Sequence, residues 1–324
     1  MKHTNDIELL GIFSKELGEP LYDISQMAIM GIVDAIKKIR WLFKVADEMV
    51  ELAKDADKIL LMDASGFNLP LAKKLKVAYP NKEIIYYILP QIWLTRPKRA
   101  KKLEQYCDHL LGILPFEVDF YSSKARYIGH PLLDEIPKCK DRYEDTGFIA
   151  YLPGSRKSEI KKLMPIYKEV AKKINKKNLL VIPSHFSSSD IQEIYGDIDD
   201  FEISRNTYDT FLKSEFAFVC SGTATLEAAL IGVPLVLAYK AKKFDAFIAR
   251  IFVKLQHVGL ANIICDFAKT ESLHVELLQE DVTVENLMQE YINMDRKLFF
   301  EKSQKLHALL KHGSKDEMIK LIKI

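Results

Sequence analysis

The sequence predicts an α/β protein with parallel, doubly wound sheets and two domains. Apolar runs rich in β-branched and aromatic residues alternate with helical patterns along most of the chain, which is typical of βαβ units. The runs are apolar throughout, as in parallel strands that are buried on both faces. A length of 324 residues is about twice that of a typical single domain. Two domains are therefore the expected organisation.

The strands are expected where these runs occur, and they fall into two sets. They are residues 8–13, 58–63, 83–89, 109–114, 147–152, 178–183, 216–220 and 234–239. The charged, proline-containing stretch 129–147 reads as the connection between the sets. We expect an N-terminal domain at 1–138, a second domain at 139–295, and helices at 296–324 that either pack back or are exchanged within a homodimer.

Composition excludes several classes of protein. A formal net charge of +2 is too small for the whole molecule to attract nucleic acid strongly. A content of 48% hydrophobic and 28% charged residues is ordinary for a globular protein. Four scattered cysteines without a C-x-x-C pair favour reduced thiols and predict no metal site. The N-terminus lacks the layout of a signal peptide and no apolar run reaches the length of a spanning helix. We therefore expect a cytoplasmic protein, or one peripheral to a membrane.

The stretch 216–239, FAFVCSGTATLEAALIGVPLVLAY, is the most informative part of the chain. A strand ends at Ser221, and the next helix should bury Leu226, Ala229, Leu230 and Val233, which leaves Glu227 off the core face. The free N–H groups of Gly222, Thr223 and Ala224 would cradle a diphosphate, and Glu227 would bind a ribose. The alternative is that Ser221 or Thr223 merely caps the helix and Glu227 is solvated.

Two other strand ends carry polar groups. In AYLPGSRKSEI (150–160), Arg156 is placed to meet a phosphate beside a helix N-terminus, unless it is a surface arginine with Ser155 or Ser158 as the cap. In ILLMDASGFNLPLAKK (59–74), Asp63 ends a strand, where burial would raise its pKa toward that of a general base. The alternative for Asp63 is a helix N-cap.

Basic segments indicate an anionic surface or a phosphorylated substrate. Segments 27–49 and 239–255 mix aromatic and branched residues with Lys and Arg, as helices at a membrane interface do, and TRPKRAKK (95–102) adds a third basic run. A core-packing helix with a basic solvated face is the commoner structure for any one such segment. His130 lies between Gly129 and Pro131 at the predicted connection between the domains, and His185 follows a predicted strand end. Histidines in such positions are more often structural or solvated than catalytic.

Taken in order, these motifs resemble the lipid A disaccharide synthase family. The matching stretches run from about residue 27 to 280 and include MAIMGIVDAIKK, LLMDASGFN, YYILPQIW, LPFE, YIGHPLLDEI, LPGSRKSEI, SGTATLEAALIGVPLVLAYK, LANIICD and VELLQE. The family consists of inverting glycosyltransferases of the GT-B fold, with two Rossmann-like domains and a cleft between them. Family members usually open with a strand and a glycine-rich loop. We expect this chain to lack them, because its matching stretches imply a start about one βα unit later.

The resemblance implies a reaction, its substrates and a set of residue roles. UDP-2,3-diacylglucosamine would donate its sugar to the 6-hydroxyl of 2,3-diacylglucosamine 1-phosphate at the inner membrane, without a metal or other cofactor. Asp63 would be the base, Arg156 and the loop 221–225 would neutralise the departing diphosphate, and Glu227 would bind the ribose. The donor-site residues carried over are Ser155, Arg156, Ser221, Gly222, Thr223, Ala224, Thr225, Glu227, Asn262 and Gln279.

Other functions on the same architecture stay open at this point. A glycosyltransferase acting on a peptidoglycan precursor and a UDP-sugar 2-epimerase would also use a nucleotide-sugar site. A catalytically silent protein that binds UDP-sugar or a membrane is the alternative from another class.

Overall fold

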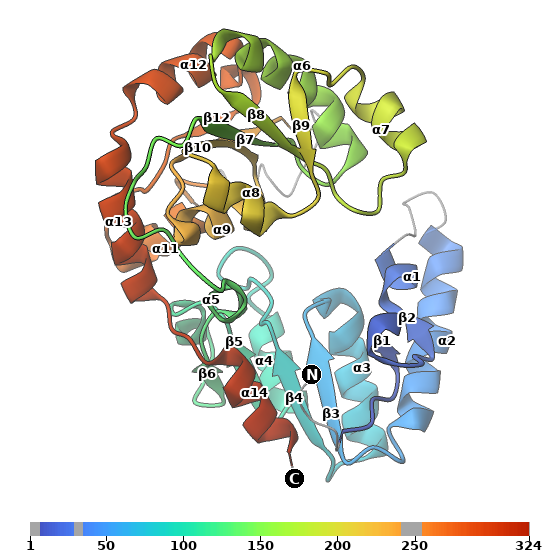
Figure 1. The fold of residues 1–324 in the computed structure, drawn as a ribbon. Helices are drawn as coiled ribbons and strands as arrows, with labels where there is room; N and C mark the ends of the chain where they lie inside the picture. Colours follow the sequence, from blue (N-terminus) through green and yellow to red (C-terminus); the bar gives the residue numbers. More distant parts are fainter. Residues whose placement is uncertain (1–6, 29–34, 241–254, 324) are drawn as a thin grey trace. The chain divides into compact units, whose positions relative to one another are not determined.

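The computed structural model describes residues 7–28, 35–240 and 255–323 (Figure 1). The basic segments 27–49 and 239–255 therefore lie partly outside the described residues. The chain divides into two units, residues 1–131 with 312–324, and residues 132–311. The sequence predicted instead that the first domain ends at residue 138 and the second at residue 295.

The first unit contains a four-stranded parallel sheet in the order β3-β4-β5-β6 and a separate two-stranded sheet, β1-β2. Its elements are β1 (Ile12–Phe13), η1 (Lys15–Leu17), β2 (Tyr22–Asp23), α1 (Ile24–Ala28), α2 (Ala35–Leu52), β3 (Lys58–Met62), α3 (Ser65–Ala78), β4 (Glu83–Tyr87), α4 (Arg99–Tyr106), β5 (His109–Gly112), η3 (Glu117–Phe120), β6 (Ala125–Tyr127) and the C-terminal α14 (Ser314–Ile322).

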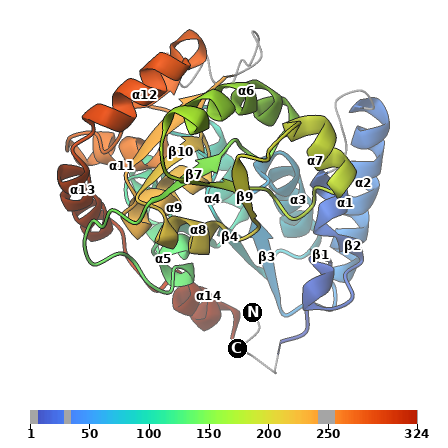
Figure 2. The same ribbon diagram turned by 45° about the horizontal axis from the view of Figure 1, so that its top comes forward.

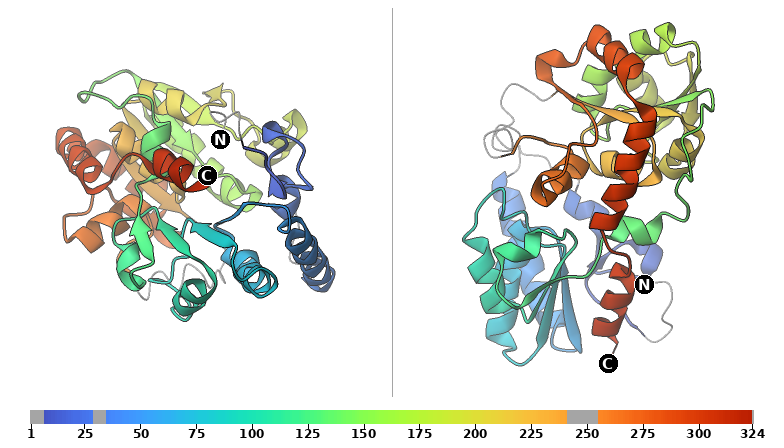
Figure 3. Two further views of the ribbon diagram at one scale, coloured as in Figure 1. Left: turned by 90° about the horizontal axis from the view of Figure 1, so that it is seen from below. Right: turned by 90° about the vertical axis from the view of Figure 1, so that its left-hand side faces the viewer.

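Helices cover both faces of this sheet. Alternate residues of β4 point to opposite faces: Ile84 and Tyr86 join the core beneath α2, α3 and α4, whereas Ile85 and Tyr87 pack with Met318 of α14. The Tyr87 hydroxyl and Ser314 Oγ lie 2.9 Å apart. Figure 3 shows α14 running along the sheet, so the last residues of the chain complete the core of the first unit.

The second unit contains a six-stranded parallel sheet in the order β12-β11-β10-β7-β8-β9. Its elements are α5 (Pro131–Glu135), which begins at the boundary, β7 (Phe148–Leu152), α6 (Lys157–Lys173), β8 (Lys177–Val181), α7 (Ser188–Tyr195), β9 (Phe201–Ser204), α8 (Thr207–Lys213), β10 (Phe216–Cys220), α9 (Thr223–Ile231), β11 (Leu235–Tyr239), α11 (Leu260–Ala268), β12 (Glu276–Leu278), η4 (Gln279–Asp281), α12 (Val284–Asn293) and α13 (Arg296–Leu309).

Two helical layers sandwich the six-stranded sheet (Figure 2). Helices α6 and α12 lie on one face, and α8, α9, α11 and α13 lie on the other. Every residue of β10 and β11 is buried, as expected for central parallel strands. The chain order reverses beside β7, since β8 and β9 extend the sheet on one side whereas β10, β11 and β12 extend it on the other. Such a switch point is where open α/β sheets bind ligands, at the carboxyl ends of the strands.

The predicted α/β fold with parallel sheets and C-terminal helices is confirmed, and one expected strand is misplaced. Residues 8–13 contain only the two-residue β1, which pairs with β2 and does not join the larger sheet. Strands β2, β6, β9 and β12 were not predicted. Each is short and carries polar or charged residues, which obscures the apolar pattern. Within the described ranges, no helix is both long enough and apolar enough to cross a membrane.

Candidate functional site

The carboxyl ends of β7 and β10 bring two helix N-termini together at the switch point of the second unit. Leu152 of β7 pairs with Val219 of β10, and α6 and α9 follow these strands. A Cβ atom added to Gly154 would come within 3.1 Å of Cys220 Sγ, which shows how closely the two turns approach. The first N–H groups of each helix have no acceptor within the helix, so both turns present donors and a positive dipole end.

Neither of these helices is closed by a capping side chain. The N-cap of α6 is Arg156 and that of α9 is Gly222, and neither makes a side-chain cap hydrogen bond. The capping alternatives for Ser155, Ser158, Ser221 and Thr223 are therefore wrong. By contrast, Ser187 caps α7 and Asn206 caps α8 in the same unit. The helices at the switch point thus keep their N–H groups available for an anion.

Arg156 is exposed at this edge and is held by a neighbour that the sequence did not single out. Its Nη1 donates a 2.7 Å hydrogen bond to Oε1 of Glu159, which is buried. This hydrogen bond and the Glu159 charge raise the pKa of Arg156. The glutamate one turn into a helix was the available signal, because residues three apart on a helix lie side by side.

The residues of the 221–225 loop differ in their access to a ligand. Ser221 and Ala224 are partly exposed and Gly222 and Thr223 are exposed, as a cradle requires. Thr225 is fully buried, and its hydroxyl donates to the Gly222 carbonyl at 2.7 Å. The Thr225 hydroxyl thus stabilises the turn that carries Gly222, and the assignment of Thr225 to the UDP-sugar site stays a prediction.

Glu227 is half-buried on α9, one turn beyond the loop. The predicted core face of the helix is confirmed, because Leu226, Ala229, Leu230 and Val233 are all fully buried. Burial, followed by the charge of Glu135, raises the pKa of Glu227. A carboxylate that has lost part of its hydration gains from hydroxyl donors, which is what a ribose would offer.

Asn262 and Gln279 lie near one edge of the same sheet. Asn262 is in α11, and Gln279 follows the edge strand β12. Asn262 is fully buried, and its amide donates to the His274 carbonyl at 2.9 Å and to Oε1 of Glu276 at 2.8 Å. Its own oxygen accepts from the N–H of Leu273 at 2.8 Å. These hydrogen bonds give the Asn262 side chain a structural role, and its assignment to the UDP-sugar site stays a prediction. Gln279 follows β12 with φ of 54°, so its backbone occupies a strained conformation at the carboxyl edge.

Glu276 is the charged residue that Asn262 supports. Its two carboxylate oxygens accept hydrogen bonds from the N–H of Val258 at 2.7 Å and of Gly259 at 3.0 Å. A Cβ on Gly259 would lie 2.9 Å from Oε1 of Glu276 and equally close to His274. This packing requires glycine, and it fixes the start of α11 at the edge of the sheet.

In the first unit, Asp63 ends β3 in a strained turn. Asp63 and Ala64 have φ of 46° and 37°, a conformation that costs roughly 1–3 kcal/mol for each non-glycine residue. The side chain of Asp63 is exposed, so the burial expected around it is not found. The N-cap alternative is also wrong, because α3 is capped at Ala64 with no side-chain bond.

Asn68 of α3 holds this strained backbone in place. Its Nδ2 donates to the carbonyls of Met62 at 2.8 Å and Asp63 at 3.0 Å. The Tyr86 hydroxyl also donates to the Asp63 carbonyl, and the Asp63 N–H donates to Tyr87. The backbone is therefore fixed from several sides, whereas the Asp63 side chain is exposed.

The two histidines that the sequence singled out, His130 and His185, do not follow the strand ends β7 and β10 that carry the site described above. His130 is buried in the first unit, and His185 is exposed after β8 with its ring 4.2 Å from that of Phe186. In the described part of the chain, no three His, Cys, Asp or Glu side chains are grouped as metal ligands would be. All four cysteines are free thiols.

Comparison with known proteins decides the family. The family model described as lipid-A-disaccharide synthetase matches residues 1–320. The chain belongs to this family. The lipid-A-disaccharide synthase of Helicobacter acinonychis (strain Sheeba) is 48% identical over 322 residues, covering 95% of this chain and 89% of that protein. The enzyme of Campylobacter jejuni (strain RM1221) is 44% identical over 339 residues, covering 99% and 92%. The resemblance noted in the sequence is thereby confirmed.

Solved structures agree on the fold. Acinetobacter baumannii MurG aligns with a TM-score of 0.54 at 14% identity, covering 95% of this chain and 86% of that one. The calicheamicin glycosyltransferase CalG4 aligns with a TM-score of 0.55 at 11% identity, covering 95% and 87%. Membership of the lipid-A-disaccharide synthetase family makes this chain a glycosyltransferase, and the solved structures show that it has the GT-B fold.

Proposed function

We propose that the chain transfers 2,3-diacylglucosamine from UDP-2,3-diacylglucosamine to the 6-hydroxyl of 2,3-diacylglucosamine 1-phosphate. The anomeric carbon would form a bond to the acceptor oxygen as its bond to UDP breaks, with inversion. The observation that carries the proposal is the pair of uncapped helix N-termini at β7 and β10, with Arg156 on one and Glu227 on the other. A diphosphate next to a ribose matches this order of groups.

Each residue has a defined task in this reaction. Asp63 accepts the proton that leaves the acceptor hydroxyl, which makes the oxygen nucleophilic. Arg156 and the N–H groups of the 221–224 loop stabilise the negative charge that grows on the departing UDP. Glu227 accepts hydrogen bonds from the ribose and orients the nucleotide. Asn262 and Glu276 position the start of α11.

The same groups support a reaction without a metal ion. Many glycosyl donors need a cation to balance the leaving diphosphate. Here the Arg156 guanidinium and the N-termini of α6 and α9 follow two paired strands, and they would supply that positive charge. No metal or organic cofactor is part of the proposed mechanism.

The acyl chains of both substrates place the enzyme at the cytoplasmic face of the inner membrane. Helix α2 supports this location, because Ile39 and Phe43 are exposed at 52% and 55%, and Arg40 and Lys44 are exposed next to them. Exposed apolar groups among cations suit a surface of anionic lipid.

The test is UDP release by the purified chain given UDP-2,3-diacylglucosamine in detergent micelles, with and without 2,3-diacylglucosamine 1-phosphate. Release that depends on the acceptor is the expected result. Release without any acceptor, or conversion of UDP-N-acetylglucosamine to its 2-epimer, would point to a different UDP-sugar enzyme. Binding of UDP-sugar without release under either condition would identify a silent binding protein.

A further inference from the structure

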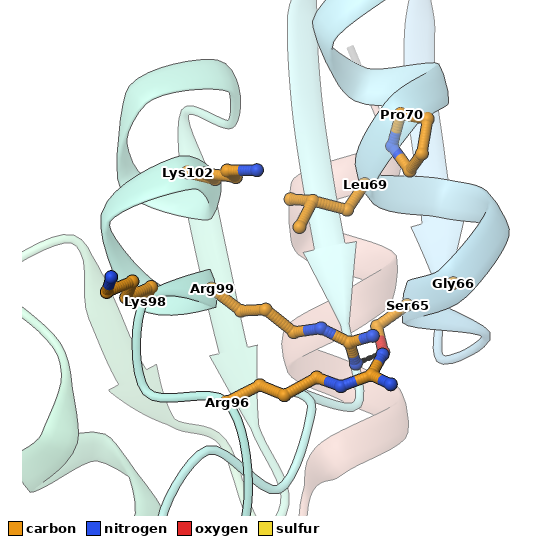
Figure 4. Close-up of a pocket in the computed structure, with 8 residues that line it drawn as sticks. All are labelled: Ser65, Gly66, Leu69, Pro70, Arg96, Lys98, Arg99 and Lys102. Atoms are coloured by element: carbon orange, nitrogen blue, oxygen red, sulfur yellow. Dashed lines mark hydrogen bonds between the residues drawn. The ribbon is translucent and has the colours of Figure 1, made fainter.

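A pocket of about 290 Å³ lies in the first unit, between the start of α3 and the basic segment 95–102 (Figure 4). Half of the residues that line it are cations. They are Ser65, Gly66, Leu69, Pro70, Arg96, Lys98, Arg99 and Lys102. The volume lies near the lower end of the range for small-molecule sites, so it suits a single small group rather than a whole lipid.

The two arginines are held in place by the fold. Arg99 Nη1 donates a 2.6 Å hydrogen bond to Ser65 Oγ, and the Arg99 N–H donates to the Arg96 carbonyl at 3.0 Å. Arg96 has φ of 56°, in the left-handed region that a non-glycine residue adopts only under constraint. Figure 4 shows both guanidinium groups directed toward Ser65. Two planar forks therefore converge on one point.

The positive charge in this pocket is not balanced by acids. Among the described residues, none of the four cations forms an ion pair, whereas Lys74 and Lys76 of the neighbouring helix pair with Asp47 and Asp108. Burial and the adjacent Arg96 charge lower the pKa of Arg99. Like charges held together in this way gain from a bound anion, and arginine forks match the oxygens of a phosphate.

We infer that the converging Arg96 and Arg99 forks, with Lys102 and Ser65, form a subsite for the phosphomonoester of the acceptor sugar. The inference rests on the proposed function for the identity of the acceptor. Ser65 is two residues after Asp63 in the same turn, so a sugar anchored here lies beside the base. In a glucosamine 1-phosphate, C1 and C5 both flank the ring oxygen, and C5 carries the C6 hydroxymethyl group whose hydroxyl reacts. One ring can therefore present its hydroxyl to Asp63 while its phosphate occupies the pocket, with Leu69 and Pro70 against its apolar side.

The test uses the double variant Arg96→Gln/Lys102→Gln, which leaves Arg99 and its bond to Ser65 unchanged. The matched control is Lys101→Gln, an exposed cation of the same helix that does not line the pocket. For each protein, kcat/KM is measured with 2,3-diacylglucosamine 1-phosphate and with the same acceptor lacking its phosphate. We expect the preference for the phosphorylated acceptor to fall at least tenfold in the double variant and to keep the wild-type value in Lys101→Gln. An unchanged preference in the double variant overturns the subsite.

A second arm separates a sugar phosphate from a lipid headgroup. Binding to phosphatidylglycerol vesicles is measured for the same three proteins, and we expect no selective loss in the double variant. Loss of vesicle binding with an unchanged acceptor preference would assign the pocket to the membrane surface and overturn the inference.

A third arm decides the subsite even when the proposed function fails. Water-soluble glucosamine 1-phosphate and glucosamine are titrated and followed by NMR. Wild-type binding of the phosphorylated sugar alone, lost in the double variant, supports the subsite whether or not any UDP is released. Equal binding of both sugars, or of neither, by the wild type overturns it.

Discussion

The Arg156 guanidinium is anchored by Glu159, whose carboxylate lies against Gly154 in the turn between β7 and α6. Nη1 of Arg156 and Oε1 of Glu159 are 2.7 Å apart, and a Cβ on Gly154 would come within 2.8 Å of the other carboxylate oxygen. Because Glu159 uses one of five N–H donors, the rest of the fork stays available for a phosphate. The glycine is thus part of what positions the arginine.

Gly154→Ala is expected to weaken UDP binding, because the new methyl group displaces Glu159 and with it Arg156. The matched control is Gly147→Ala, since Gly147 also has positive φ but has nothing within 4 Å of an added Cβ. Both variants should lose roughly 1–3 kcal/mol of stability from backbone strain. Calorimetric titration with UDP should distinguish them, and equal affinities in the two variants would rule out this role for Gly154.

Much of the fold was visible in the sequence because buried parallel strands are apolar without interruption. Strand β10 occupies residues 216–220, as expected, and the strand expected at 234–239 is found as β11. Strand β9, FEIS, was missed because Glu202 faces solvent at the edge of the sheet. The apolar run 8–13 predicted a sheet strand, but pairing depends on which neighbours the fold provides, and the sequence does not contain that information.

The sequence indicates which turns carry the candidate site, but not which side chains in them face a ligand. Loop 221–225 and Arg156 could be proposed because polar residues interrupt apolar runs at strand ends. The sequence could not show that the Thr225 side chain is buried, or that the Asn262 amide donates a hydrogen bond to Glu276. Both features depend on how other segments pack around these residues. Glu159 and Asn68 were missed for the same reason. They support the backbone or another side chain, and their types are ordinary for helices.

Glu227→Ala is expected to weaken UDP binding by about 1.5–3 kcal/mol through loss of charge-assisted hydrogen bonds to the ribose. The helix should be unaffected, because alanine is a strong helix former. Titrations with UDP and with 2′-deoxy-UDP localise the effect, since the variant should discriminate less between the two nucleotides than the wild type does. Unchanged UDP affinity would reduce Glu227 to a structural acid of α9.

Asp63→Asn is expected to abolish turnover while leaving UDP affinity nearly intact. Asparagine tolerates the left-handed backbone found at this position and has a similar shape, so it removes the base with little strain. Asp63→Ala should have the same kinetic effect with some loss of stability. Single-turnover UDP release and UDP titration are the measurements. A large loss of UDP binding in Asp63→Asn would show that this residue belongs to the nucleotide site.

EDTA is expected to leave the rate of UDP release unchanged, because Arg156 and the helix N-termini supply the positive charge at the diphosphate. The rate should be measured after dialysis against EDTA and again after addition of Mg²⁺ or Mn²⁺. Arg156→Lys tests the same idea from the protein side, since it keeps the charge but loses the fork, and we expect a lower kcat. A strict requirement for a divalent ion would contradict the mechanism.

Glu117 should make the first unit less stable as pH rises from about 4.5 to about 7. The side chain is buried, which raises its pKa from 4.5 to about 7, even though the N–H groups of Ile113 and Leu114 donate to it. Between these values the folded chain holds a proton that the unfolded chain releases, so stability is full below the unfolded pKa and declines up to the folded one. A shift of about 2.5 units at 1.36 kcal/mol per unit corresponds to roughly 3 kcal/mol.

Urea unfolding followed by tryptophan fluorescence isolates this effect, because both tryptophans, Trp41 and Trp93, lie in the first unit. Trp93 also stacks edge-to-face on Phe116, next to Glu117, with ring centroids 5.3 Å apart. Glu117→Gln imitates the protonated acid, so the loss of stability between pH 5 and 7 should shrink in this variant. The exposed neighbour Asp119, changed to Asn, should keep the wild-type slope. Equal slopes in the wild type and Glu117→Gln would mean that Glu117 is ionised in the folded chain throughout this range.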